Sequence, residues 1–262
     1  DSDTENDVIE DIDSDTDGGD SNKGQAVVGT VSGTSISFGS IVVFNNATTF
    51  QISMAFDPST TGKFVVNYMD VGNGYKGYSS LGTLSGSSIS FVTSVPFTAA
   101  AAGDINYTST AFDPNTAGKY VVSYRIGSGG GYYGTAVLGQ IASSIITTNV
   151  TASNFLGTST AAFADGETAT VIPVGGVAGG VSNVAMSIPV GAETVYNVGS
   201  TYSTQLSFDP NNASKCVIVY TDSANSNAGT AIVGTLSGTT LTFGTEVVFN
   251  AASSDSPSVA FD

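Results

Sequence analysis

The chain has 262 residues, of which 40% are hydrophobic, so it is long enough to bury the core of one large or two small domains. Six Lys and Arg against 22 Asp and Glu give a net charge of −16, and this balance argues against nucleic acid or an anionic membrane surface as a partner. Because histidine is absent, Ser-His-Asp catalysis and histidine-ligated zinc are excluded. No apolar run approaches the ~20 residues that a membrane-spanning helix needs, so we expect no membrane insertion.

The first predicted element is an acidic leader, residues 1–23, which has almost no apolar content and which we expect to be a disordered linker. Part of it has the alternating carboxylates and the glycine, Gly18, of a calcium-binding loop. Gly24 stands where an EF-hand needs its bidentate Glu, and no helices are predicted on either side. The leader is therefore either a solvated tether or a simpler calcium loop, and in the second case its ligands are Asp13, Asp15, Asp17 and Asp20.

The rest of the chain consists of repeats. Residues 29–45 and 234–250 are identical at eleven of seventeen aligned positions, residues 82–97 are a third copy and residues 139–150 a weaker fourth. A second motif, AFDP or SFDP in its best copies, precedes these blocks and contains a phenylalanine that recurs at intervals of 56, 51, 45 and 53 residues. These phenylalanines are Phe56, Phe112, Phe163, Phe208 and Phe261.

Each repeat predicts four short strands, which in the first complete copy are residues 50–56, 63–68, 79–84 and 88–91. Apolar and polar residues alternate in the first of these strands, as they do in a half-buried strand. Asp57 and Pro58 favour a turn after it, and Gly86 favours a tight hairpin between the last two strands. Since no segment of the body has the apolar stripe of an amphipathic helix, we expect an all-β fold.

Four antiparallel strands in about 50 residues are typical of a β-propeller blade. We therefore predict a β-propeller-like array over residues 24–262, either a five-bladed ring or a fragment of a larger propeller. A linear array of β-repeats is the alternative. The predicted parts are a partial blade (24–47), blades at 48–98, 104–150 and 201–250, a degenerate blade (155–198) and the first strand of a further blade (254–262).

The SGTSISFG, VVFN, AFDP and GKFVV motifs resemble a propeller-type tandem repeat of large surface and tail-associated proteins from marine bacteria and their phages. The resemblance covers residues 25–262, although residues 152–200 depart from the pattern. It implies a binding or structural role in a protein that is extracellular, on a cell surface or part of a virion.

The loops after the second strands differ between repeats, whereas the turns after the FDP motif are nearly uniform. Varied loops on a rigid scaffold are typical of recognition sites, and tyrosine can stack on a sugar or anchor an interface. The candidate ligand-binding residues are accordingly Tyr75, Lys76, Tyr132 and Tyr133.

No catalytic residue is assigned, because the repeated Asp57, Asp113 and Asp209 are explained by turn formation. We therefore expect a non-enzymatic binding or adhesion module for a cell-surface glycan or protein. One alternative is a purely structural repeat of a tail, fibre or surface layer, in contact with neighbouring copies. The other is a polysaccharide hydrolase, which would need two convergent carboxylates.

Cys216 is the only cysteine, which excludes an intrachain disulfide. It occupies the strand position that Phe64 and Tyr120 occupy in the other repeats, so we predict a small buried hydrophobic residue and not a reactive thiol.

Overall fold

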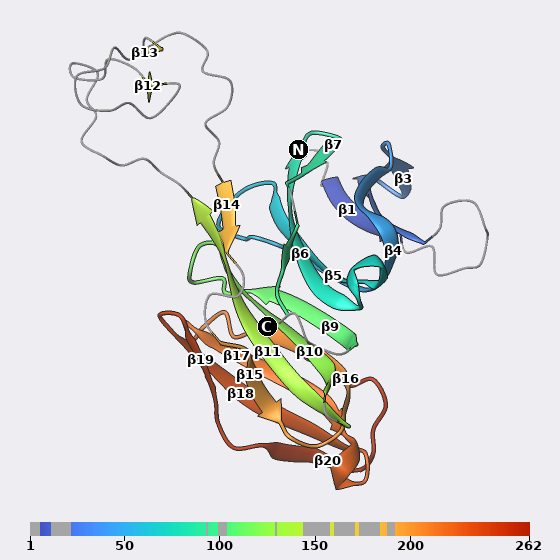
Figure 1. Cartoon of the computed structure of the whole chain (residues 1–262), viewed down its shortest axis with the longest axis vertical. Coiled ribbons are helices and arrows are strands. Elements are labelled where there is room, and N and C mark those ends of the chain that lie inside the picture. The colour runs from blue at the N-terminus through green and yellow to red at the C-terminus, as the bar shows by residue number, and fades with distance from the viewer. Residues whose placement is uncertain are drawn as a thin grey trace. The chain divides into compact units, whose positions relative to one another are not determined.

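The computed structural model describes the residues 6–11, 22–92, 94–98, 104–128, 130–143, 158–159, 171–172, 184–187 and 192–262 (Figure 1). In these ranges the chain forms strands, two short 3₁₀ turns and no α-helix. The prediction of an all-β chain with antiparallel sheets is confirmed. None of the described residues belongs to a helix that is long and apolar enough to cross a membrane.

The chain divides into two compact units. The first unit comprises Asp1–Ile141 and Met186–Asp262, and the second comprises Ala142–Ala185. Within the described part of the second unit, β12 (Thr158–Ser159) pairs with β13 (Val171–Ile172). All sites discussed below belong to the first unit.

Three sets of strands in the first unit repeat one plan, in which four strands form a meander and a short fifth segment pairs with the third strand; the first set is part of an eight-stranded sheet. The 48–98 sheet contains the second half of β4 (Val42–Phe56), then β5 (Lys63–Asp70), β6 (Lys76–Ser85), β7 (Ser88–Phe91) and β8 (Val95–Pro96). The next sheet contains β9 (Ile105–Phe112), β10 (Lys119–Ser128), β11 (Gly131–Ser143), β14 (Val184–Ser187) and β15 (Thr194–Asn197). The last contains β16 (Thr201–Phe208), β17 (Lys215–Asp222), β18 (Ala228–Ser237), β19 (Thr240–Phe243) and β20 (Val247–Ser253).

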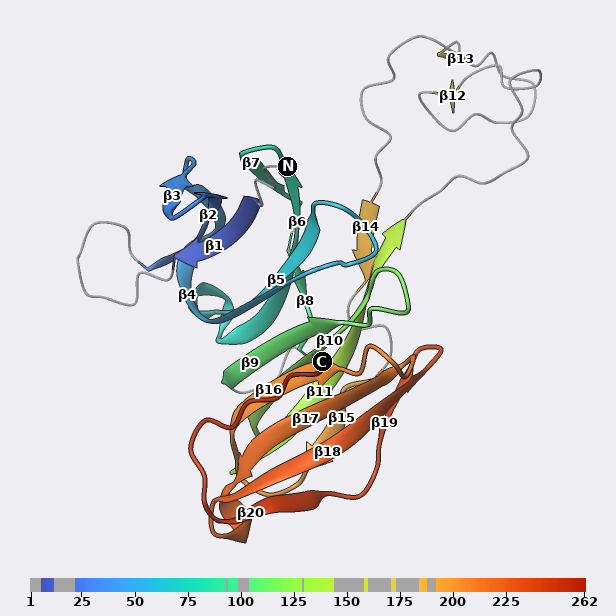
Figure 2. The same ribbon diagram turned by 180° about the vertical axis from the view of Figure 1, so that it is seen from behind.

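The described parts of the 155–198 segment do not make up a separate blade between the second and third sheets. β14 and β15, which the sequence assigned to a degenerate blade, pair with β11 and complete the sheet of β9 and β10. Moreover, β9 of the second sheet packs against β4 on one side and against β16 on the other (Figure 2). The second sheet is therefore in direct contact with the third, and no further described sheet lies between the two. The prediction of a degenerate blade rested on the copy of the phenylalanine motif around Phe163, most of which lies outside the described residues.

The acidic leader also differs from the expectation of a linker, because Asn6–Asp11 form the strand β1. This strand pairs antiparallel with β2 (Lys23–Ser32), and β2 forms a hairpin with β3 (Ser35–Phe38). The register of β1 is that of a second strand: Asp7 lies opposite Gly29, as Phe64 lies opposite Gly82 and Tyr120 opposite Gly139. The candidate calcium ligands Asp13, Asp15, Asp17 and Asp20 lie outside the described residues.

Successive sheets are joined by a recurring aromatic contact. An aromatic ring after the fourth strand covers the glycine near the start of the third strand, and a Cβ on Gly77 would lie 2.3 Å from the Phe97 ring. The same ring packs on the second-strand tyrosine of the next sheet, with a centroid distance of 5.3 Å between Phe97 and Tyr124. Equivalent pairs are Phe44 with Tyr68 at 5.1 Å and Tyr196 with Tyr220 at 5.2 Å. The glycine is needed because a side chain there would displace the ring.

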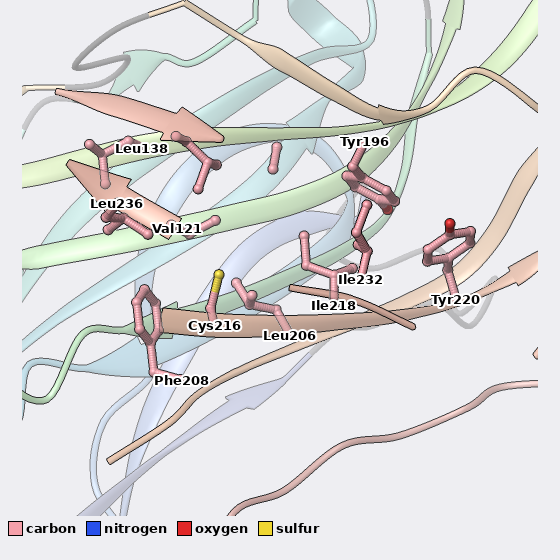
Figure 3. Close-up of a cluster of buried hydrophobic side chains, with 12 residues drawn as sticks. Val121, Leu138, Tyr196, Leu206, Phe208, Cys216, Ile218, Tyr220, Ile232 and Leu236 are labelled. Atoms are coloured by element: carbon pink, nitrogen blue, oxygen red, sulfur yellow. The ribbon is translucent and has the colours of Figure 1, made fainter. Parts of the chain in front are cut away.

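A hydrophobic cluster between the second and third sheets contains Cys216, which is fully buried (Figure 3). The cluster includes Val121 and Leu138 from the second sheet and Leu206 and Ile218 from the third. The prediction of a small buried residue at position 216 is confirmed.

Burial raises the pKa of the Cys216 thiol to about 12, because the thiolate would lose its hydration in this cluster. We therefore expect iodoacetamide at pH 8 to leave the native protein unlabelled and to label it fully in denaturant, as measured by intact mass. Labelling of the native protein at the rate of a free thiol would contradict the buried position.

Alkaline pH should destabilise the fold, because five core tyrosines have raised pKa values, first of all through burial. The unfolded tyrosines ionise near pH 10 while the folded ones keep their protons, so the unfolded state binds fewer protons and stability falls as the pH rises above 10. Absorbance at 295 nm should show these tyrosines titrating only with unfolding. They are Tyr68, Tyr120, Tyr124, Tyr196 and Tyr220.

Candidate functional site

The first strand of each repeat contains one residue with a left-handed backbone conformation. The φ angles are 55° at Gln51, 54° at Tyr107 and 49° at Ser203, and Ser256, at the equivalent position after β20, has 49°. In the three paired strands the residue lies at a shift of the register against the second strand, so each of these strands has a β-bulge at the same point. Bulges redirect side chains and are common next to functional sites.

Side-chain hydrogen bonds join these first strands to one another and to neighbouring second strands. The backbone N–H of Tyr107 donates to Oε1 of Gln51 at 2.7 Å, and the N–H of Leu206 donates to Oγ of Ser109 at 3.0 Å. The hydroxyls of Ser123 and Thr204 are 2.7 Å apart. The contact between sheets is therefore polar near the bulges.

A hollow of about 400 Å³ opens beside these bulges. It is bordered by β9, by β16 and by the segment after β20. Most of its lining residues carry a hydroxyl or amide group, although polar and apolar atoms line it about equally. Its lining residues are Tyr107, Thr108, Ser203, Thr204, Gln205, Ser256, Pro257 and Ser258. This volume lies within the usual range for small-molecule sites, roughly 300–1,000 Å³.

Arg125, the single arginine of the chain, lies among three tyrosine rings, one of which, Tyr107, lines this hollow. Its guanidinium carbon is 4.9 Å from the ring centre of Tyr107, 4.6 Å from that of Tyr132 and 4.8 Å from that of Tyr202. Tyr107 and Tyr202 also contact each other edge to face at 6.0 Å. Cation–π attraction to each ring, about 0.5–2 kcal/mol, holds the guanidinium in place.

The hydrogen-bonding capacity of Arg125 is not used by the described part of the chain. Its Nε is buried without a hydrogen-bond partner, and no described carboxylate forms an ion pair with the guanidinium. An arginine has five N–H donors in a planar fork. The terminal Nη1 and Nη2 are not among the buried unpaired atoms of the described residues, so their N–H groups are open to a ligand, whereas the buried Nε is not.

The structure brings one of the four sequence-predicted binding residues to Arg125. Tyr132 lies in β11 opposite Gly127 and packs on the guanidinium. Tyr133, the next residue, folds back over Gly131, where a Cβ would lie 2.5 Å from its ring. Tyr75 is exposed at the end of the β5–β6 hairpin and Lys76 begins β6, so both belong to a different sheet.

Sequence reasoning missed Arg125, Tyr107 and Tyr202. The repeats place Met69 and Thr221 where the second sheet has Arg125, and Gln51 and Ser203 where it has Tyr107. Arg125 and Tyr107 therefore depart from the repeat, and this departure was the signal that could have revealed them, whereas Tyr202 aligns with another aromatic residue, Phe50.

The repeated aspartates hold turns, as the sequence predicted. Oδ1 of Asp57 accepts the backbone N–H of Ser59 at 2.9 Å, and Oδ1 of Asp113 accepts that of Asn115 at 2.9 Å. Asp209 accepts from Asn211 in the same way at 2.8 Å. Each carboxylate bonds the backbone two residues later, which is the geometry of an Asx turn.

Within the described ranges no group of three or more His, Cys, Asp or Glu side chains is arranged to hold a metal ion. No protein-family model matches the chain, and no curated protein matches its sequence.

Proposed function

We propose that this chain is a non-enzymatic binding module that takes a glycan in the hollow beside Arg125. The observation that supports the proposal best is the position of Arg125, held by three tyrosine rings next to a hollow bordered by hydroxyl and amide groups. Such groups match the hydroxyls of a sugar, and a tyrosine ring can pack against its C–H faces.

Two features favour binding over hydrolysis at this site. Among the described residues no carboxylate lines the hollow, whereas a glycosidase needs two of them flanking the scissile bond. The repeated Asp57 and Asp113 bond the backbone of their own turns. The polysaccharide hydrolase is therefore the weaker alternative.

A structural role in an assembly is the second candidate, because one end of the array has an uncovered apolar strand. Val247, Val248 and Phe249 of β20 are exposed, and the Phe249 side chain is 55% accessible. Its equivalents Phe44 and Phe97 pack on a tyrosine of the next sheet. A neighbouring copy or a protein partner is an alternative occupant of this surface.

We also propose that the sheets form a closed propeller of four blades, not five. The first three blades are the three complete sheets, and the fourth combines β1, β2 and β3 with the segment after β20 as its first strand. Two observations support this: β1 has the register of a second strand, and Ser256 has the backbone conformation of a first-strand bulge. A linear array remains the alternative that the following test distinguishes.

Closure can be tested with a disulfide. In the third sheet Ser207 lies opposite Val217, and the equivalent positions in the fourth blade are Ala260 and Val8. We expect Val8→Cys with Ala260→Cys to cross-link within one chain under mild oxidation, as seen by non-reducing gel and intact mass. The matched control, Val8→Cys with Ser254→Cys, should not cross-link. A chain that cross-links only between molecules, or equally in both variants, would contradict closure.

Because the repeats resemble those of large surface and tail-associated proteins, we propose an extracellular, cell-surface or virion location for this chain. The role of the leader as a calcium loop stays a prediction.

Glycan binding can be tested by screening the full chain on an oligosaccharide array and titrating the strongest hit by calorimetry. We expect Tyr132→Ala to weaken binding at least about tenfold, since it removes a ring that positions Arg125. Tyr75→Ala, an exposed tyrosine of another hairpin, should leave binding unchanged. Failure of every glycan to bind, or equal loss in both variants, would overturn the site. Release of reducing ends from a bound polysaccharide would favour the hydrolase.

A further inference from the structure

We infer that the ligand of this hollow carries a carboxylate, as a uronic acid does, and that Arg125 binds that carboxylate. This inference rests on the proposed function and names the class of sugar. It begins from a cation whose donor edges have no described partner, although the chain has an excess of acidic residues. Of its cationic side chains, Arg125 alone is held among tyrosine rings.

The geometry of the tyrosines explains why an arginine is used. Three rings, from Tyr107, Tyr132 and Tyr202, surround the guanidinium at 4.6–4.9 Å and restrict its orientation. A fixed guanidinium loses less side-chain entropy when it binds, and its planar fork matches the two oxygens of a carboxylate. A lysine has neither the flat faces that stack on the rings nor the paired donors.

The hollow supplies the complementary contacts for the rest of the sugar. Tyr107 belongs both to the ring cluster and to the lining, which also includes Ser203 and Gln205, so this one ring connects the guanidinium to the hollow. A pyranose with a carboxylate on one carbon can thus direct the acid to Arg125 and its hydroxyls into the hollow. None of the lining residues is charged, which favours one negative charge per sugar over a phosphate with two.

The test uses the full chain and four probes: digalacturonate, its methyl ester, the neutral disaccharide of galactose, and galactose 6-sulfate. Calorimetric titration at pH 7 should show that the ester and the neutral sugar bind at least about tenfold more weakly than the acid, the usual effect of losing hydrogen bonds to a charged group. Equal binding of acid and ester would overturn the inference. Stronger binding of the sulfate would also overturn it and identify a sulfated ligand.

Variants separate the inference from the proposed function. Arg125→Gln should remove the preference for acid over ester while weak binding of the neutral sugar persists, and Arg125→Lys should retain only part of that preference. Lys23→Gln removes the same charge outside the hollow and should leave all affinities unchanged.

Neutral sugars that bind as well as digalacturonate, with Arg125→Gln unaffected, would reject the carboxylate but keep the glycan site. Absence of binding by all four probes would reject the carboxylated sugar, while the array screen decides the glycan site independently. The acid–ester comparison on the unaltered chain needs no variant to fold.

Discussion

Replacing Phe97 by Ala should lower the free energy of unfolding by about 3–5 kcal/mol, the usual cost of truncating a fully buried aromatic ring. Phe97 is 0% exposed, covers Gly77 and packs on Tyr124 of the next sheet at 5.3 Å. The substitution therefore opens a cavity at the junction between two sheets. Urea denaturation followed by tyrosine fluorescence measures the change, since the chain has no tryptophan.

Two control variants make this result specific. Val198→Ala removes apolar atoms from a side chain that is 83% exposed, and its free energy of unfolding should change by less than about 0.5 kcal/mol. Phe249→Ala alters the equivalent ring of the third sheet. Because its ring is 55% exposed in the described structure, the substitution should be nearly neutral; a clear loss of stability would show that a fourth blade covers this ring and would favour the closed propeller. A neutral Phe97→Ala would contradict the aromatic junction itself.

Gly82→Ala should destabilise the protein by about 1–3 kcal/mol, the usual cost of inserting a methyl group into a packed core. Its Cβ would lie 2.1 Å from the ring of Phe64. That ring is fully buried and is held by Phe56 at 5.2 Å and Phe91 at 5.6 Å, so it has little room to move. Thermal and urea denaturation of the variant measure the loss.

The third sheet offers the matched control, because Cys216 takes the place of the aromatic ring there. A Cβ on Gly234 would lie 2.6 Å from Sγ of Cys216, a smaller side chain with fewer contacts to displace. Gly234→Ala should therefore cost less than Gly82→Ala. A larger cost at Gly234 would show that the aromatic ring is not what requires the glycine.

The strands of each repeat were predictable because their information is local. Alternation of apolar residues, the Asp57–Pro58 turn and the Gly86 hairpin depend on neighbours in sequence, and the structure has strands and turns at these places. The role of the repeated aspartates followed from the same local rule. The position of Cys216 was predictable because the repeats can be aligned.

The binding site was only partly predictable, because its parts come from positions where the repeats differ. Tyr132 was found through the variability of its loop. Arg125, Tyr107 and Tyr202 were not found, since they lie on three different strands that meet only in the folded chain. No spacing in the sequence shows that a guanidinium and two rings approach within 5 Å.

The sequence by itself determined that this is an all-β repeat protein, because hydrophobic alternation and turn residues act over a few neighbouring positions. Only the tertiary structure decided which segments belong to one sheet. It assigned β14 and β15 to β11, and β1 to the edge of β2. Strand pairing depends on backbone hydrogen bonds that any sequence can form, so distant partners are selected by packing in three dimensions. The same packing created the site around Arg125.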